Sequence, residues 1–123
     1  MILSVDPSRA LPVYEQVREQ IRRMVAAGVL QPGTRLPTIR QLAADLGLAK
    51  GTIERAYELL EGDAVIARHG RNGSYVSDVA QSTEREMTVA LEVAAEALVI
   101  VARQLGADEA ATLRAVSSAW KQL

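Results

Sequence analysis

The feature of this sequence that most constrains its fold is the very short link between two helical patterns. The first pattern starts at Thr38 and stops at Gly47, and the second starts at Ala49 or Lys50. Only Gly47, Leu48 and Ala49 are left to connect them. Two short helices joined by a tight turn that contains glycine are typical of a helix-turn-helix.

Signals at the helix ends support this prediction. Thr38 and Gln41 have the spacing of a capping box, in which each side chain bonds to the backbone of the other residue. A longer helix is predicted before them, over Leu11–Ala27, with Pro12 in its first turn and Gly28 after its end. The predicted apolar faces of the three helices are Tyr14, Val17, Ile21 and Met24; Ile39, Leu42, Ala43 and Leu46; and Ile53, Ala56, Tyr57 and Leu60.

The pattern then changes from helical to strand-like. Val65–Arg68 and Ser74–Val76 are short runs of the kind that form strands. The turn between them contains Asn72-Gly73, which is a strong hairpin signal. We therefore predict a β-wing after the helix-turn-helix, and Ile2–Val5 is a candidate third strand.

A second helical region follows a polar connector over Asp78–Ser82. The helix predicted from Thr83 to Leu105 has an apolar heptad seam, with a second apolar stripe beside it that a lone helix would not need. Gly106 stops this helix, and Asp108 can cap a final one. We expect the seam to lie against a partner chain or against the final helix. The predicted dimer contacts are Met87, Leu91, Ala94, Leu98, Val101 and Leu105, with Leu113, Val116 and Trp120 from the final helix.

Composition excludes some classes of protein. Hydrophobic residues make up 49% of the chain and charged residues 24%, which is typical of a globular protein. The chain has no cysteine, so we expect neither disulfides nor thiolate chemistry, and a reducing, cytoplasmic location. We expect no signal peptide and no contact with a membrane, because the apolar run Ala97–Ala102 is too short to cross a bilayer.

Together these patterns predict an α+β chain that is mostly helical. Residues 1–78 are expected to form a winged helix-turn-helix that binds DNA, and residues 79–123 a two-helix dimerisation tail. The net charge of -1 does not by itself indicate nucleic-acid binding. The first part of the chain is mildly basic and the tail is acidic, which fits a division into two roles.

The chain resembles the GntR family of bacterial regulators over roughly Pro12–Val76. The resemblance rests on fragments in order, which are PVYEQV from Pro12, GVLQPG from Gly28, LPTIRQLA from Leu36, LG at Leu46, TI at Thr52, RAY at Arg55, LE at Leu60, HG at His69 and GSYV at Gly73. This resemblance implies a homodimer that binds a pseudo-palindromic operator in double-stranded DNA, usually as a repressor. The short tail is similar to that of the YtrA-like subfamily, in which it mainly dimerises.

Four residues depart from the family pattern. Ala49 stands where Ser or Thr is common, so the following helix lacks a capping hydroxyl that is worth about 1 kcal/mol. Lys50 stands where arginine is usual, Glu54 where many members have a basic or neutral residue, and Ala64 where glycine is usual. These differences concern how DNA is read and leave the predicted fold unchanged.

The predicted DNA contacts come from the recognition helix and the wing. A recognition helix presents its N-terminal residues to the major groove, where Lys50 or Arg55 can bond to guanine. The family resemblance adds Arg40 in the preceding helix and a wing tip that enters the minor groove. The full predicted set is Arg40, Lys50, Gly51, Thr52, Glu54, Arg55, Arg68, His69, Gly70 and Arg71.

Two residues of the predicted recognition helix, Glu54 in the contact set and Tyr57 outside it, have more than one candidate role. The Glu54 carboxylate can accept a hydrogen bond from the cytosine N4 amine, or it can pair with Lys50 and orient that side chain. Alternatively, Glu54 simply clears the groove. Tyr57 is expected in the core first, with phosphate binding as its second candidate role.

Other classes of function compete with this prediction. An enzyme needs a nucleophile, an acid–base pair or metal ligands, and the chain has one histidine and no His/Asp/Glu cluster. We therefore expect no enzyme activity, metal or cofactor. The alternative function is a winged helix used only for protein–protein contacts, which DNA binding with steep salt dependence would exclude. A small-molecule effector of unidentified chemistry is a further candidate partner, between the tail helices and the DNA-binding part.

Overall fold

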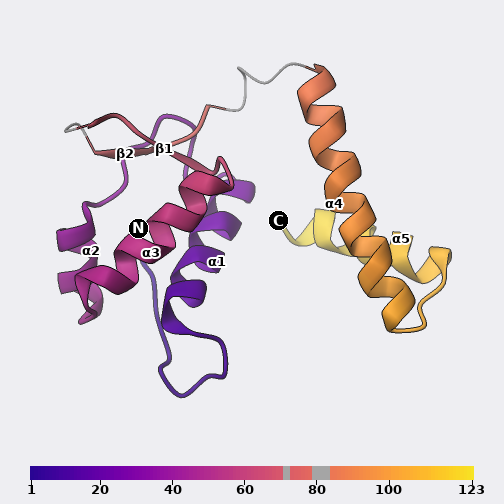
Figure 1. Ribbon diagram of the computed structural model, residues 1–123, viewed down its shortest axis with the longest axis horizontal. Helices are drawn as coiled ribbons and strands as arrows, with labels where there is room; N and C mark the ends of the chain where they lie inside the picture. Colours follow the sequence, from indigo (N-terminus) through magenta and orange to yellow (C-terminus); the bar gives the residue numbers. More distant parts are fainter. Residues whose placement is uncertain (71–72, 79–83) are drawn as a thin grey trace. The chain divides into compact units, whose positions relative to one another are not determined.

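The computed structural model describes residues 1–70, 73–78 and 84–123. The chain forms two compact units, Met1–Asp78 and Val79–Leu123. Within the described residues, the first unit contains three helices and a hairpin, and the second contains two helices (Figure 1). The predicted class is confirmed: the chain is mostly α, with a winged helix-turn-helix followed by a short pair of helices.

The first unit is built around α1 (Val13–Ala26), α2 (Ile39–Leu46) and α3 (Lys50–Gly62). α3 packs against both α1 and α2 (Figure 1). The predicted apolar faces supply most of the core, because residues three or four apart lie on one side of a helix. The core consists of Leu3, Val17, Ile21, Leu30, Leu36, Leu42, Ala43, Ile53, Ala56, Tyr57, Leu60, Ile66 and Val76.

The ends of these helices follow the local sequence. The Gln41 amide donates to Oγ1 of Thr38 at 3.0 Å, and the Thr38 amide donates to Oε1 of Gln41 at 3.0 Å, which confirms the capping box. Gly47 ends α2 with φ 65°, in the left-handed region that glycine adopts without a Cβ clash. Ala49 precedes α3 with no side-chain hydrogen bond to cap it, as predicted.

The wing is an antiparallel hairpin of β1 (Ile66–Arg68) and β2 (Ser74–Val76). A further extended segment pairs with it from the chain that leads into α2. Arg35 forms an isolated bridge with Tyr75, and the Leu36 amide donates to a β2 carbonyl at 2.9 Å. The wing is therefore tied directly to the entry of α2.

The expectation that Ile2–Val5 adds a strand to the hairpin is wrong, because this segment forms no strand and bonds to side chains of α1 instead. Oε1 of Gln20 accepts from the Ser4 amide at 3.1 Å, and Nε2 of Gln20 donates to the Ser4 carbonyl at 2.6 Å. The buried Gln16 makes the same two bonds with the backbone of Asp6, each at 2.8 Å. A glutamine amide offers the donor and acceptor of a peptide group, so α1 takes the place of a neighbouring strand.

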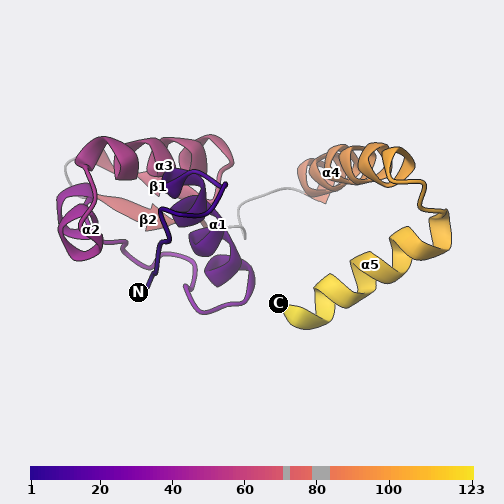
Figure 2. The same cartoon turned by 90° about the horizontal axis from the view of Figure 1, so that it is seen from below.

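The second unit consists of α4 (Glu84–Gln104) and α5 (Glu109–Gln122), which meet at a sharp turn and diverge from it (Figure 2). Gly106 in the turn has φ 76°, and the Asp108 carboxylate accepts from the first turn of α5 at 2.8 Å, as the predicted stop and cap require. Ala102 is the only buried residue among those described in the two helices. None of the described helices has the length and apolarity needed to span a membrane.

Candidate DNA-binding surface

The N-terminal half of α3 carries its exposed residues opposite the core. Lys50, Gly51, Glu54 and Arg55 are exposed, and Thr52 is half-buried. The buried residues of α3 are Ile53, Ala56, Tyr57 and Leu60, as the apolar periodicity predicts. Beyond its own helix, nothing lies within 4 Å of the place where a Cβ on Gly51 would stand. The backbone is therefore open to close approach at this position.

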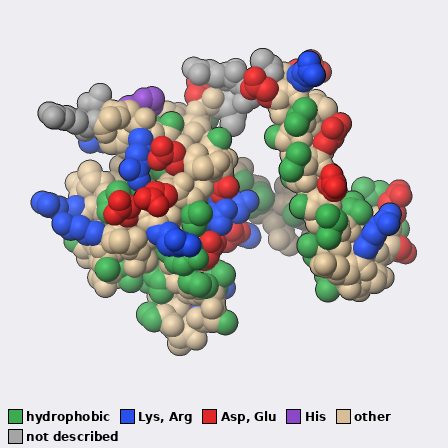
Figure 3. Space-filling view, in the orientation of Figure 1, with side chains coloured by type: hydrophobic (Ala, Val, Ile, Leu, Met, Phe, Trp, Pro, Cys, Tyr) green, Lys and Arg blue, Asp and Glu red, His purple; other side chains and the backbone are tan. Residues whose placement is uncertain are grey.

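A second exposed basic position lies on α2, where Arg40 is in the first turn. Figure 3 shows Lys and Arg side chains at the left edge of the first unit, on the α2 side, and acidic side chains nearer its centre, over α3. The exposed carboxylates of α3 are Glu54, Glu58 and Glu61. Because DNA is polyanionic, the beginning of α3 suits its groove better than the rest of the helix.

Glu54 and Lys50 form no ion pair in the part of the chain that the structure describes. The pairing that would orient Lys50 is therefore not made in the free protein. The Glu54 carboxylate is exposed one turn after Lys50. Direct reading of cytosine and simple clearance of the groove both stay predictions for this residue.

The wing holds two of the predicted contact residues against the protein. Nε of Arg68 lies 3.0 Å from Oε2 of Glu61 on α3, so its charge is engaged in an ion pair. The His69 ring packs edge-on against Tyr75, with the ring centroids 5.1 Å apart. The first contact ties the end of β1 to α3, and the second packs the residue after β1 against β2.

Gly73 of the wing lies beside an arginine outside the predicted set. Gly70 and Gly73 have φ of 58° and 93°, and Arg71, predicted at the tip, lies outside the described residues. A Cβ on Gly73 would stand 3.4 Å from Nε of Arg35. Arg35 is exposed and adds a positive charge beside Gly73, at the turn end of β2. No local signal predicts this position, because it depends on the pairing of the segment before α2 with β2.

Tyr57 joins the recognition helix to the entry of α2 from inside the core. It is 1% exposed, and its hydroxyl donates to the Pro37 carbonyl at 2.7 Å. Burial raises the pKa of Tyr57 to about 12. The hydroxyl already serves the protein backbone, so the second candidate role, phosphate binding, does not fit its position.

The predicted heptad residues of α4, called the α4 seam from here on, are uncovered within one chain. Leu91 is 63% exposed, and Trp120 on α5 is 84% exposed. Figure 3 shows hydrophobic side chains along the surface of these helices. The exposed residues are Met87, Leu91, Ala94, Leu98, Val101 and Leu105 of the seam, with Leu113, Val116 and Trp120 of α5. The alternative that the seam packs on α5 of the same chain therefore does not hold.

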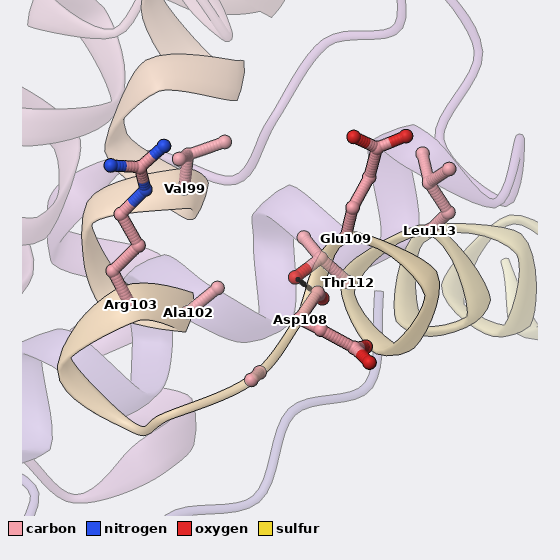
Figure 4. Close-up of a pocket in the computed structure, with 8 residues that line it drawn as sticks. Val99, Ala102, Arg103, Asp108, Glu109, Thr112 and Leu113 are labelled. Atoms are coloured by element: carbon pink, nitrogen blue, oxygen red, sulfur yellow. Dashed lines mark hydrogen bonds between the residues drawn. The ribbon is translucent and has the colours of Figure 1, made fainter.

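A cavity of about 320 Å³ lies at the turn between α4 and α5. Figure 4 shows Arg103 on the α4 side and Thr112 and Leu113 on the α5 side. The lining also includes Glu109 and Asp108, of which Asp108 is engaged in capping α5. In residues 1–70, 73–78 and 84–123 there is no group of three or more His, Asp and Glu side chains that could hold a metal ion.

The match to a known family covers this surface. The family described as "Bacterial regulatory proteins, gntR family" matches residues 13–76, which include the helix-turn-helix and the wing. The chain belongs to the GntR family. It is thus a DNA-binding transcription regulator, and the predicted resemblance is confirmed.

Two relatives extend the similarity of this GntR regulator beyond the first unit. The HTH-type transcriptional regulator Rv1152 of Mycobacterium tuberculosis is 40% identical over 112 residues, or 91% of this chain and 88% of that protein. The HTH-type transcriptional repressor YtrA of Bacillus subtilis is 32% identical over 93 residues, or 74% of this chain and 72% of that protein. Both alignments are longer than residues 1–78, so they include part of the tail.

Solved structures share the fold. YtrA from Sulfolobus acidocaldarius, described as a GntR-family transcription factor, matches with a TM-score of 0.72 at 25% identity and covers 98% of both chains. AraR(DBD) in complex with operator ORX1 matches with a TM-score of 0.56 at 27% identity, over 63% of this chain and 99% of that chain. The first similarity includes the tail, so the regulator is YtrA-like, and the second is to a domain bound to operator DNA.

Proposed function

We propose that this GntR-family regulator is a homodimer that represses transcription by occupying a pseudo-palindromic operator. The observation that carries the proposal is that residues 1–78 bury a complete core, whereas the α4 seam is exposed at every predicted contact position. Large exposed apolar surfaces mark contacts with partners. A second copy fits this surface, because one seam can meet the same seam about a two-fold axis.

On the DNA side, the beginning of α3 is proposed to enter the major groove of each half-site. Lys50 at the start of α3 and Arg40 in the first turn of α2 are exposed charged contacts, and Arg35 places a charge where the wing would approach the adjacent minor groove. Arg68 contributes less than the sequence predicts, because its ion pair must be exchanged for DNA. The proposed contact set is Arg40, Lys50, Gly51, Thr52, Glu54, Arg55, Arg68, His69, Gly70 and Arg71, with Arg35 added.

Repression is supported by the relatives, since YtrA of Bacillus subtilis is named a transcriptional repressor. A dimer seated on its operator blocks access to the same DNA. A cytoplasmic location and the absence of an enzymatic reaction belong to this proposal, because both relatives are named as regulators of transcription.

An effector of unidentified chemistry is also part of the proposal. In place of the site expected between the tail helices and the DNA-binding part, its candidate site is the cavity at the turn between α4 and α5. Its lining combines apolar side chains with Arg103 and Glu109. Small metabolites can be screened by their effect on the thermal unfolding of the full chain. A compound that stabilises the wild type and not Arg103→Ala supports the site, and equal stabilisation of both places the compound elsewhere.

DNA binding and dimerisation are tested together on the full chain. Operators are selected from a random double-stranded library, and binding is then titrated at increasing salt while sedimentation gives the oligomeric state. We expect an inverted repeat, a steep fall of affinity with salt and a dimer. Arg40→Ala should weaken binding, whereas Arg22→Ala, an exposed arginine on α1, should not. A monomer that selects single half-sites contradicts the homodimer, and binding without salt dependence contradicts the DNA contacts.

The same selection decides the role of Glu54. If Glu54 reads cytosine, Glu54→Gln relaxes the preference at one position in each half-site by about 1–3 kcal/mol. If the variant selects the same operator and binds it more tightly, the carboxylate only clears the groove.

A further inference from the structure

The guanidinium of Arg55 on α3 lies over the ring of Tyr14 in the first turn of α1, with Cζ 4.6 Å from the ring centroid. Arg55 is exposed and Tyr14 is half-buried. The contact joins the recognition helix to the N-terminal end of α1. An arginine over an aromatic face is attracted to the negative face of the ring, so its flexible side chain is held in one place.

The Arg55 guanidinium forms no ion pair with a carboxylate among the described residues. Arg18, one turn further along α1, lies 3.1 Å from Glu15 and 2.6 Å from Asp63, so it occupies both of these carboxylates. No ion pair or side-chain hydrogen bond among the described residues uses the N–H groups of Arg55, so they are free to donate.

The direction of the stack matters for what Arg55 can reach. The major groove is about 12 Å wide and just admits a helix, so the flanks of a recognition helix face the phosphates that border the groove. Base edges lie in front of the helix. Since Tyr14 belongs to α1, the stack draws the Arg55 side chain to the α1 flank of α3 and away from its front.

We propose that Tyr14 is a positioning residue that presents Arg55 to a DNA phosphate at the α1 edge of each half-site, so that Arg55 serves affinity and not the choice of base. The proposal rests on the DNA binding argued above and assigns a role to Tyr14, which the apolar periodicity places only in the core. Arg55 would bind the phosphate oxygens with N–H groups that have no partner among the described residues.

A double-mutant cycle on the full chain tests this coupling. Operator affinity is measured for Tyr14→Leu, Arg55→Ala and the double variant, with Tyr14→Phe as the matched control that keeps the ring. The proposed dimer contains this exposed cation–π contact twice. We therefore expect Tyr14→Leu to weaken operator binding about 5- to 30-fold. The loss should vanish in the Arg55→Ala background, and Tyr14→Phe should bind like the wild type. Thermal unfolding of each free variant identifies any that fail to fold.

The salt dependence and the selected operator separate a phosphate contact from base reading. Arg55→Ala should lower the salt slope by about one per half-site and weaken all sequences alike, whereas Arg55→Lys should keep the slope. A Tyr14→Leu loss that persists without Arg55 overturns the positioning role. A changed base preference in Arg55→Ala overturns the phosphate assignment. Absence of salt-dependent operator binding by the wild type would instead reject the proposed function itself.

Discussion

The first unit of this chain buries most of its apolar side chains, whereas the second leaves most of them exposed. Residues 1–78 bury them in one core, to which three helices, the wing and the N-terminal segment all contribute. In the second unit, α4 and α5 leave them exposed, and Ala102 is the only residue described there as buried. Because burial of apolar surface drives folding, we expect the first unit to fold alone and, under the proposed function, the second to depend on association with a second copy. On the proposed function, one chain would bind a half-site, and two chains would be needed to bind a pair of half-sites.

Separating the units should have the largest effect on function. A protein ending at residue 82 is expected to be a folded monomer whose unfolding midpoint does not change with concentration. It should bind the operator about 10²- to 10⁴-fold more weakly than the full chain, because the two half-site contacts are no longer linked. Sedimentation and operator titration check both expectations. If the shortened protein still sediments as a dimer, the tail is not the interface.

One leucine-to-alanine change in each unit sharpens the contrast. Leu60 is fully buried, so Leu60→Ala should lower the free energy of unfolding by about 2–5 kcal/mol at every protein concentration. Leu91 is exposed in one chain, so Leu91→Ala should raise the Kd of the dimer, and its effect on the unfolding midpoint should depend on concentration. Unfolding at several protein concentrations measures this. A Leu91→Ala variant with unchanged dimer Kd would mean that no partner covers this part of the α4 seam.

The core of the first unit also contains a polar group whose effect depends on pH. Burial raises the pKa of Tyr57 to about 12, above its ordinary value of 10.0, so the folded state holds this proton more tightly than the unfolded state. The resulting stability is complete below pH 10 and is lost as the pH rises toward 12. Tyr57→Phe removes the hydrogen bond to Pro37, so its free energy of unfolding at neutral pH should be lower by about 1 kcal/mol. Its free energy of unfolding should also fall less between pH 10 and pH 12 than that of the wild type. Equal alkaline slopes for the two proteins would contradict this.

The smallest effect should come from one strained residue of the first unit. Ala64 has φ 59° and is the only non-glycine with positive φ among the described residues. Ala64→Gly removes this strain, although glycine also raises the entropy of the unfolded chain. We therefore expect the free energy of unfolding, measured in urea, to rise by about 0.5–1 kcal/mol. Gly47→Ala, at φ 65°, is the matched control, and its free energy of unfolding should be lower than that of the wild type by about 1 kcal/mol. Neither change should alter the dimer Kd, and an effect on it would show that the units are not independent.

Features that depend on neighbours three or four residues apart were predictable from the sequence. The Thr38–Gln41 box, the left-handed Gly47 and the Asp108 cap all lie where local chemistry requires them. The buried faces of the helices follow from periodicity in the same way. The hairpin also follows from local signals, because a turn and two short β-rich runs suffice to indicate it.

Contacts between residues far apart in the sequence were decided by the tertiary structure alone. The pairing of Arg35 with β2, the glutamines of α1 that hold the N-terminal segment, and the stack of Arg55 on Tyr14 each join separate elements. Apart from the strand expected at Ile2–Val5, the sequence by itself determined which helices and strands form, since the free energies of capping, turn formation and helix periodicity arise within a few residues. Which basic side chains remain available for DNA depends on how the elements pack. Packing brings Arg68 to Glu61 and leaves Arg55 without a carboxylate partner among the described residues.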